Sequence, residues 1–533
     1  MDPDILLATL NAKFIHTAFG LRYLLANLGE LRPRAALAEF DINQRPIDIA
    51  EAILARNPRV LGLGVYIWNV RPTTELVGLL KRARPELIII LGGPEVSFET
   101  EEQEIVQLAD HVIPGEADCK FAEVCRVLLE TSARGETSGG EEADGPNPPA
   151  PVPVLPKIIP ADLPNLTELE LPYLLYDDRD LSQRVIYVEA SRGCPFTCEF
   201  CLSSLDVPVR QFPLERFLAE IQRLLDRGAN QFKFVDRTFN LHLPTSTAIL
   251  KFFLQRWRPG LFIHFEMVPD RLPEPLRELI AKFPPGALQF EVGIQTLNPE
   301  VEARISRRQN QAKLEENLHW LRAHSGVHVH ADLIVGLPGE SLESFGEGFD
   351  RLVALGPQEI QVGVLKRLRG TPIVRHDREW AMIYNPHPPY EIVQNRDLDF
   401  ATLGRLRRFA GFWDLFGNSG RFRECLPRLW MSGLVTHSPF QAFLKFSDWL
   451  HLRDVKTSGV ALTRQFELLW EYLTEELQQP SRELSPLMLN EYGRTGRTDH
   501  PSWLSESIRP VAQPTVRRRV LPKRQAQHLG SAD

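Results

Sequence analysis

The chain has 533 residues, more than one hydrophobic core usually accommodates, so we expect several domains. Its 43% hydrophobic and 24% charged residues are typical of a globular protein, and the net charge of −8 gives no electrostatic case for a nucleic-acid partner. No apolar run approaches the roughly 18 residues that a membrane span needs, and the acidic start at residues 1–5 lacks the features of a signal peptide.

Residues 1–130 alternate strand-like and helix-like segments. Continuous apolar runs at 5–10, 60–67 and 87–91 are typical of buried parallel strands. Between the strands, apolar residues recur at helical spacing, as in Leu21, Leu24, Leu25 and Leu28. This rhythm predicts an α/β domain with a doubly wound, flavodoxin-like parallel sheet, in which ligands bind at the carboxyl ends of the strands.

A change of composition separates this domain from the next. Residues 131–156 are rich in glycine, proline and acidic residues, which favours a disordered linker over 131–160.

A second strand–helix series follows over residues 161–378. We predict strands at 184–190, 231–236, 261–266, 288–295, 327–336 and 359–365, with helices such as 214–225 between them. Six such units predict a partial or full βα barrel with its active site at the C-terminal strand ends.

Two further regions complete the chain. Residues 379–500 read as a helical domain with a small core of its own, supplied by Trp413, Phe416, Trp430, Trp449 and Trp470. Residues 501–533 are basic and carry scattered prolines, so we expect a disordered tail.

Three of the six cysteines, Cys194, Cys198 and Cys201, lie within eight residues, directly after the first predicted strand of the second series. Three thiolates so close together can hold one metal centre, and soft thiolate ligands suit both an iron–sulfur cluster and zinc. In the zinc alternative, a distant ligand such as His242 or His264 would complete a structural site. The other cysteines are isolated and are expected to be small buried residues, so a reducing cytoplasm is the expected location.

The stretch 191–201, Ser-Arg-Gly-Cys-Pro-Phe-Thr-Cys-Glu-Phe-Cys, resembles the signature of radical S-adenosylmethionine (SAM) enzymes. The segments 234–240, 290–296, 332–340 and 361–372 resemble the corresponding strand ends of that family. The resemblance implies a [4Fe–4S] cluster on the three cysteines. It also implies reductive cleavage of SAM to a 5′-deoxyadenosyl radical, with an electron donor such as flavodoxin or ferredoxin.

The same resemblance suggests which residues contact SAM. Phe200 would pack against adenine, while Asp236, Glu291 and Gln295 would face amine and ribose groups. Gly336 would let the backbone approach the ligand closely. The alternatives are an internal salt bridge between Asp236 and Arg237 and an ordinary turn at 336–339.

The first domain resembles the cobalamin-binding domain that precedes many radical SAM enzymes. The resemblance is carried by residues 91–97 and 112–116, and it implies cobalamin contacts from Gly92, Gly93, Glu95, Gly115 and Glu116. The loop after the first strand, residues 11–20, departs from the Asp-x-His-x-x-Gly pattern that supplies a cobalt ligand. Asn11 and His16 are the candidate cobalamin contacts in this loop. The alternative for His16 is a capping or packing role. For the cofactor, the alternatives are five-coordinate cobalt, a bound water as the lower ligand, or loss of cobalamin.

Together with residues 65–69 and the helical C-terminal region, these motifs resemble radical SAM proteins that have a B12-binding domain and a DUF4080 region. The resemblance implies a cobalamin-dependent radical SAM enzyme that methylates or rearranges an unknown small-molecule or macromolecular substrate. The alternative from another class is a non-catalytic iron–sulfur and corrinoid sensor or scaffold.

Overall fold

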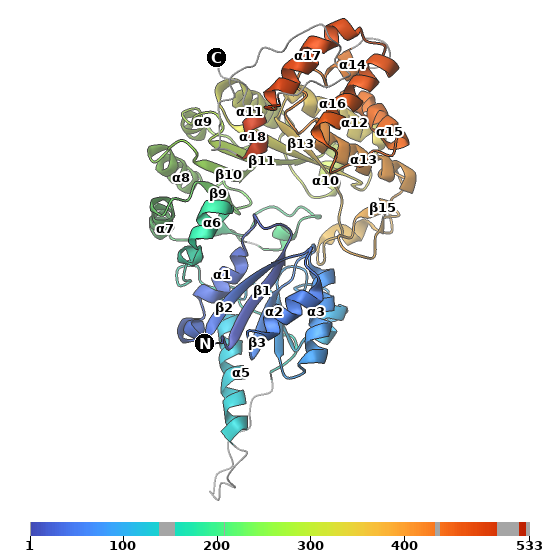
Figure 1. Ribbon diagram of the computed structural model, residues 1–533. Coiled ribbons are helices and arrows are strands. Elements are labelled where there is room, and N and C mark those ends of the chain that lie inside the picture. Colours follow the sequence, from blue (N-terminus) through green and yellow to red (C-terminus); the bar gives the residue numbers. More distant parts are fainter. Residues whose placement is uncertain (1, 138–154, 207, 432–436, 498–521, 529–533) are drawn as a thin grey trace, which may run out of the picture.

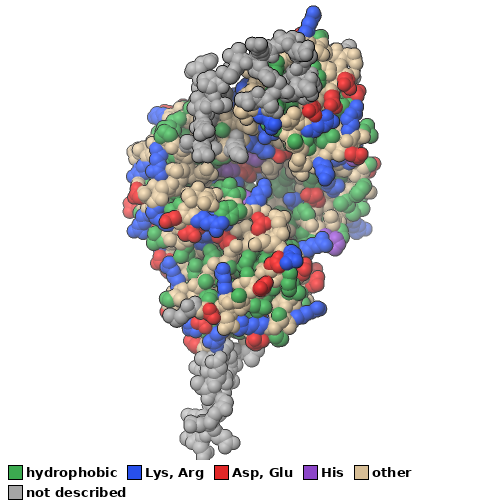
Figure 2. Space-filling view, in the orientation of Figure 1, with side chains coloured by type: hydrophobic (Ala, Val, Ile, Leu, Met, Phe, Trp, Pro, Cys, Tyr) green, Lys and Arg blue, Asp and Glu red, His purple; other side chains and the backbone are tan. Residues whose placement is uncertain are grey.

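A computed structural model describes residues 2–137, 155–206, 208–431, 437–497 and 522–528. The N-terminal domain lies at one end of the molecule, the larger barrel domain in the middle, and the C-terminal helices at the other end (Figure 1). On the face shown in Figure 2, acidic and basic side chains are interspersed over the coloured, described part of the surface. Among the described residues, no helix is long and apolar enough to cross a membrane.

The N-terminal domain is the predicted doubly wound sheet. Its five parallel strands have the order β2-β1-β3-β4-β5, and apolar clusters cover both faces. The elements are β1 (Ile5–Asn11), α1 (Phe19–Ala26), β2 (Ala35–Asp41), α2 (Pro46–Leu54), β3 (Val60–Gly64), α3 (Val70–Ala83), β4 (Ile88–Gly92), α4 (Glu104–Leu108), β5 (His111–Ile113) and α5 (Lys120–Thr137).

The central domain is a six-stranded partial barrel with the order β13-β12-β11-β10-β9-β6, all parallel, as the sequence predicts. Its strands are β6 (Ile186–Val188), β9 (Gln231–Phe234), β10 (Phe262–Met267), β11 (Leu288–Gln295), β12 (His328–Val335) and β13 (Glu359–Val364). Its helices are α6 (Asp178–Gln183), α7 (Leu214–Asp226), α8 (Leu243–Gln255), α9 (Glu274–Ile280), α10 (Pro299–Arg304), α11 (Gln311–His324) and α12 (Leu342–Leu355). A small antiparallel pair, β7 (Ser191–Arg192) and β8 (Arg210–Gln211), leaves the sheet after β6.

The C-terminal helices do not form the separate small core that the sequence predicts. Phe349 on α12 packs edge-to-face against Phe409 and Trp413, so the helices share one continuous core with the barrel. The elements after the barrel are β14 (Ile383–Tyr384), β15 (Ile392–Gln394), α13 (Phe400–Phe416), α14 (Arg428–Met431), α15 (Pro439–Leu452), α16 (Leu462–Glu471), α17 (Ser481–Arg494) and α18 (Lys523–His528).

Two segments that the sequence assigns to disorder are partly ordered. Residues 131–137 extend α5, and residues 155–160 run beside β5, where Val112 donates to the Lys157 carbonyl at 2.7 Å. The apolar Leu155 and Ile159 explain this path, because they pack against the sheet. The middle of the predicted linker, 138–154, lies outside the described residues.

The predicted disordered tail contains a helix, α18, which packs against the barrel (Figure 1). Arg524 forms ion pairs with Glu359 on β13 and with Asp414, and Gln525 donates to Gln289 on β11. Residues 501–521 and 529–533 of that predicted tail lie outside the described residues.

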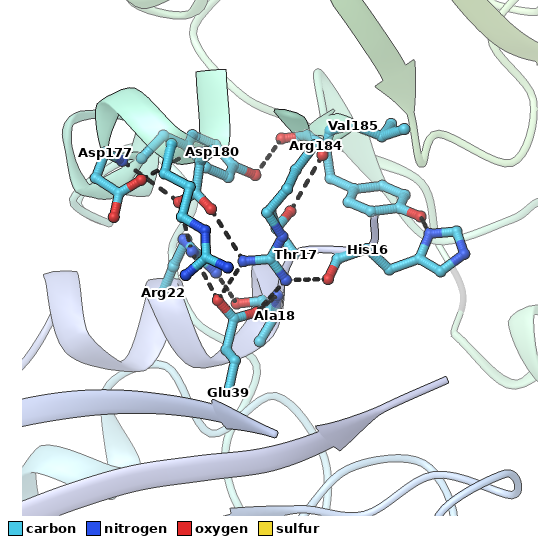
Figure 3. A network of polar contacts seen from close by, with 12 residues as sticks. His16, Thr17, Ala18, Arg22, Glu39, Asp177, Asp180, Arg184 and Val185 are labelled. Carbon is cyan, nitrogen blue, oxygen red and sulfur yellow. Dashed lines mark hydrogen bonds and ion pairs between the residues drawn. The ribbon is translucent and has the colours of Figure 1, made fainter. Parts of the chain in front are cut away.

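A buried network of charges joins the first two domains (Figure 3). Arg22 and Glu39 come from the N-terminal domain, whereas Asp180 lies on α6 and Arg184 lies between α6 and β6. Arg184 binds Glu39 at 2.6 Å and Asp180 at 2.9 Å, and Arg22 binds Asp180 at 2.7 Å and Glu39 at 3.0 Å. Every charge therefore faces two opposite charges, which offsets the cost of burying them.

Candidate functional site

The three cysteines lie at the C-terminal end of β6, where the sequence places them. The loop is closed by a hydrogen bond from the Cys194 amide to the Asp206 carbonyl at 2.9 Å. Gly193 has φ +92°, and a Cβ there would lie 2.8 Å from the carbonyl oxygens of Asp206 and Pro208. The turn before Cys194 therefore needs glycine.

Cys194, Cys198 and Cys201 line one cavity of about 170 Å³. Burial raises the pKa of the Cys194 and Cys198 thiols, but Arg307, whose Nη1 lies 3.5 Å from Cys198 Sγ, opposes the effect at Cys198. A cation beside the sulfur favours the thiolate, the form that binds metals.

The donor set fits an iron–sulfur cluster. Within the described ranges, no three His, Cys, Asp or Glu side chains are gathered closely enough to hold a single metal ion. The thiols instead face a shared cavity, as a larger thiolate-bound group requires. Neither candidate zinc ligand lines this cavity. His264 Nε2 lies 3.0 Å from Glu291, and His242 binds Thr245 at 2.7 Å beside a different cavity.

Three of the five predicted SAM residues, Phe200, Glu291 and Gln295, line the cysteine cavity. Glu291 binds Lys233 at 3.2 Å as well as His264. Burial alone would raise the pKa of Glu291, but the His264 hydrogen bond and the Lys233 charge outweigh it and hold the pKa well below its ordinary value. Glu291 therefore presents a carboxylate to the cavity.

The structure does not bring the other two predicted SAM residues into this cavity. Asp236 accepts hydrogen bonds from the Ala190 amide and from the Ser191 hydroxyl, the latter at 2.6 Å, and burial raises its pKa to about 7. Asp236 thus supports the start of the cysteine loop and is not paired with Arg237. Gly336 packs against Ile392, where a Cβ would come within 2.5 Å of that side chain.

Arg307 and Asp332 are among the residues of this cavity that the sequence does not single out. Asp332 Oδ1 is buried and accepts no hydrogen bond within the described part of the chain, where His330 Nε2 lies 3.6 Å from it. Burial, together with the nearby charges of Glu291 and Glu266, raises the pKa of Asp332 well above its ordinary value. The segment 332–340 was recognised as a strand end, but the pattern did not indicate that this carboxyl group faces the cavity.

A second cavity, of about 460 Å³, lies at the carboxyl ends of β3, β4 and β5. The predicted residues Gly92, Gly93, Gly115 and Glu116 line it, together with Gly62 and Gly64. Gly93 has φ +109°, and a Cβ there would come within 2.5 Å of the Val65 carbonyl oxygen. The glycines along this wall would let a large cofactor such as cobalamin approach the backbone closely.

The remaining predicted cobalamin residues face the domain boundary. Asn11 donates to Glu39 at 3.0 Å. His16 Nδ1 lies 2.6 Å from the Tyr187 hydroxyl, and Glu95 binds Arg369 at 3.0 Å and accepts from Tyr390 at 2.7 Å. The structure therefore supports the packing alternative for His16, and the cobalt-ligand role stays an untested prediction.

The two cavities share one residue, Arg237, which lines both. Its partner is Glu266 on β10, at 2.9 Å, and not the neighbouring Asp236. Glu189 and Arg192 of the barrel domain also line the second cavity. The glycine-lined cavity is therefore completed by the barrel domain, and the two cavities meet at the boundary between the domains.

Comparisons with known proteins agree with this architecture. Residues 5–124 match the B12 binding domain, residues 188–352 the Radical SAM superfamily, and residues 378–526 the protein of unknown function DUF4080. The fold and the site define a protein of the radical SAM class. The chain thus combines, in this order, a B12 binding domain, a radical SAM domain and a DUF4080 region.

Two curated relatives match part of the chain. The chain is 26% identical over 365 residues to the 2-(S-pantetheinyl)-carbapenam-3-carboxylate methyltransferase of Streptantibioticus cattleyicolor, covering 63% of this chain and 51% of the relative. It is 25% identical over 342 residues to the cobalamin-dependent radical SAM methyltransferase TokK of Streptomyces tokunonensis, covering 58% and 47%. The chain thus spans about half the length of these relatives.

Solved structures show the same fold. The radical SAM methyltransferase TsrM from Kitasatospora setae matches with a TM-score of 0.55 and 16% identity, covering 74% of this chain and 80% of that one. The cobalamin-dependent SAM radical enzyme OxsB matches with a TM-score of 0.57 and 13% identity, covering 92% and 79%.

Proposed function

We propose that the chain is a cobalamin-dependent radical SAM enzyme, which cleaves SAM reductively and uses the product to methylate or rearrange a substrate. The observation that carries the proposal is the meeting of two cavities at one domain boundary. One is lined by three cysteines, the other by glycines, and Arg237 lines both. The names of the methyltransferase relatives support the same function and disfavour a sensor or scaffold.

Each wall of the first cavity has a role in the proposal. Cys194, Cys198 and Cys201 would hold a [4Fe–4S] cluster, with Arg307 favouring the thiolate at Cys198. When bound, the cluster would supply the electron that cleaves SAM, and cobalamin would supply a carrier for a one-carbon group.

The remaining polar groups of that cavity would bind SAM itself. Glu291 and Gln295 offer oxygen atoms to amine and ribose hydroxyl donors. Asp332 Oδ1, which accepts no hydrogen bond from the described residues and lies 3.6 Å from His330 Nε2, would accept one from SAM. Binding thereby satisfies a group that is costly to leave buried and unpaired.

Cobalamin would occupy the glycine-lined cavity, with Gly92, Gly93 and Gly115 allowing close approach to the backbone. The electron would come from a small redox protein such as flavodoxin or ferredoxin. The free cysteines favour the reducing cytoplasm as the location.

SAM labelled with ¹³C in its methyl group tests this proposal. The anaerobically reconstituted protein would be incubated with cobalamin, reductant and labelled SAM, and the products separated by chromatography. Label on the protein-bound cobalamin supports methyl transfer, whereas 5′-deoxyadenosine with unlabelled cobalamin supports rearrangement. The proposal fails if neither labelled cobalamin nor 5′-deoxyadenosine forms.

A further inference from the structure

Arg192 connects the cysteine loop directly to the N-terminal domain. It lies two residues before Cys194, in the short strand β7. Its Nη1 lies 2.6 Å from Glu116 Oε2 and 2.9 Å from Asp118 Oδ2, and its Nε lies 3.0 Å from Glu189 Oε1. One guanidinium thus binds the end of β6 and the loop after β5 at the same time.

The contact is buried on every side. Only 13% of the Arg192 side chain is exposed, and its guanidinium stacks over the Tyr23 ring at 4.6 Å. Asp118 and Glu189 are buried as well, with side-chain exposures of 7% and 8%. A planar guanidinium can donate hydrogen bonds to several carboxylates at fixed angles. The ammonium group of a lysine could not reproduce these contacts.

Arg192 lies between the two cavities. Arg192, Glu116 and Asp118 line the glycine-lined cavity, whereas Cys194 lines the other. Only Gly193 separates Arg192 from Cys194, and its backbone is fixed between two carbonyl groups. A displacement of the loop at Glu116–Asp118 is therefore transmitted to the first cysteine through a short and rigid path.

We propose that Arg192 is a positioning residue that couples the cobalamin cavity to the iron–sulfur cavity, so that occupancy of one is felt at the other. This inference rests on the proposed function, because it concerns the two cofactors that the function requires. Coupling between two sites is reciprocal: if cobalamin changes the environment of the cluster, then the cluster changes the affinity for cobalamin.

The test compares wild type with Arg192→Gln, Arg192→Lys and a control, Arg367→Gln. Arg367 also crosses the domain boundary, where it binds Glu99 at 3.1 Å, but it lines neither cavity. Each protein is reconstituted with iron and sulfide, and its iron content and Kd for hydroxocobalamin are measured before reduction. The electron paramagnetic resonance spectrum of the cluster is then recorded with and without hydroxocobalamin in excess dithionite, which reduces the added cobalt(III) and keeps the cluster reduced.

We expect hydroxocobalamin to change the cluster spectrum of the wild type and of Arg367→Gln. In Arg192→Gln, iron content should stay normal while the spectral change disappears and the Kd rises about tenfold. Arg192→Lys should fall between them. It also replaces the glutamine variant as the test if that variant fails to assemble a cluster.

A wild-type spectral response in Arg192→Gln, or in Arg192→Lys where it stands in, would overturn this inference and leave the proposed function intact. A wild type that holds a cluster but binds no hydroxocobalamin would remove the cobalamin part of the proposed function and this inference with it.

Discussion

At the scale of single residues, the three cysteines account for the first half of the proposed chemistry. Their thiols face one cavity, and Arg307 lies beside Cys198. A cluster needs every thiolate that holds it, because each cysteine binds a different iron. The remaining cysteines lie elsewhere; Cys425, for example, is fully buried among the C-terminal helices.

Replacement of Cys198 by alanine should therefore abolish cluster binding. We expect iron content to fall from about four atoms per chain to near zero, and 5′-deoxyadenosine formation to become undetectable. The matched control is Cys425→Ala, an equally buried cysteine outside the cavity, which should keep both properties. Iron analysis and chromatography measure the outcome, and SAM cleavage retained by Cys198→Ala would contradict the assignment.

The function of a single residue can be predicted from the sequence when its partners lie close to it in the chain. Cys194, Cys198 and Cys201 were found because one short loop supplies all three ligands. Asp236 lines a separate cavity beside Ser191 and His242, which could not be predicted because a strand end in the sequence does not indicate the direction of the side chain. Arg192 gave no signal, since its partners Glu116 and Asp118 are more than 70 residues away.

At the scale of elements, the charge network between β2 and α6 fixes the β1–α1 loop against the barrel (Figure 3). Glu39 accepts from the Ala18 amide as well as from both arginines, and Arg184 donates to the Phe14 carbonyl at 2.7 Å. Burial would raise the pKa of Glu39, but hydrogen bonds from Arg184 and Arg22 lower it from 4.5 to about 2.

This depressed pKa predicts a pH-dependent contribution to stability. A carboxyl group whose pKa is lower in the folded state stabilises the protein above its unfolded pKa, here 4.5, and loses that effect as the pH falls toward 2. Glu39→Gln should therefore lower the free energy of unfolding by roughly 3 kcal/mol at pH 7, and the difference should shrink below pH 4.5.

Urea unfolding of the apo protein at pH 7 and at pH 3 measures this difference. The control is Glu30→Gln, whose exposed partner is Arg126 and which should change stability little at either pH. A Glu39→Gln variant as stable as this control at pH 7 would contradict the role of the network.

Elements themselves were predictable where burial gives a clear pattern. β1, β3, β4 and the six barrel strands were expected because they are apolar or alternate strictly. The strand β2 was missed because it is a half-exposed edge strand with a mixed sequence. Helix α18 was missed because it is short, polar and stabilised by contacts with distant residues such as Glu359.

At the scale of the whole molecule, the barrel domain completes the cavity of the N-terminal domain and shares its core with the C-terminal helices. The order of the domains was readable from composition and strand spacing. Their docking was not, because it depends on contacts such as Arg369 with Glu95 that join residues far apart in the chain. Both cavities lie at the ends of parallel strands, where the fold favours ligand binding.

In the proposed function, this molecule uses an iron–sulfur cluster to cleave SAM. The most direct test measures iron and 5′-deoxyadenosine in anaerobically reconstituted wild-type protein, reduced with dithionite in the presence of SAM. We expect about four irons per chain, a brown protein, and 5′-deoxyadenosine that forms only with reductant. Bound zinc in a colourless protein, with no 5′-deoxyadenosine, would show that the three cysteines form a structural site and that the chain does not cleave SAM.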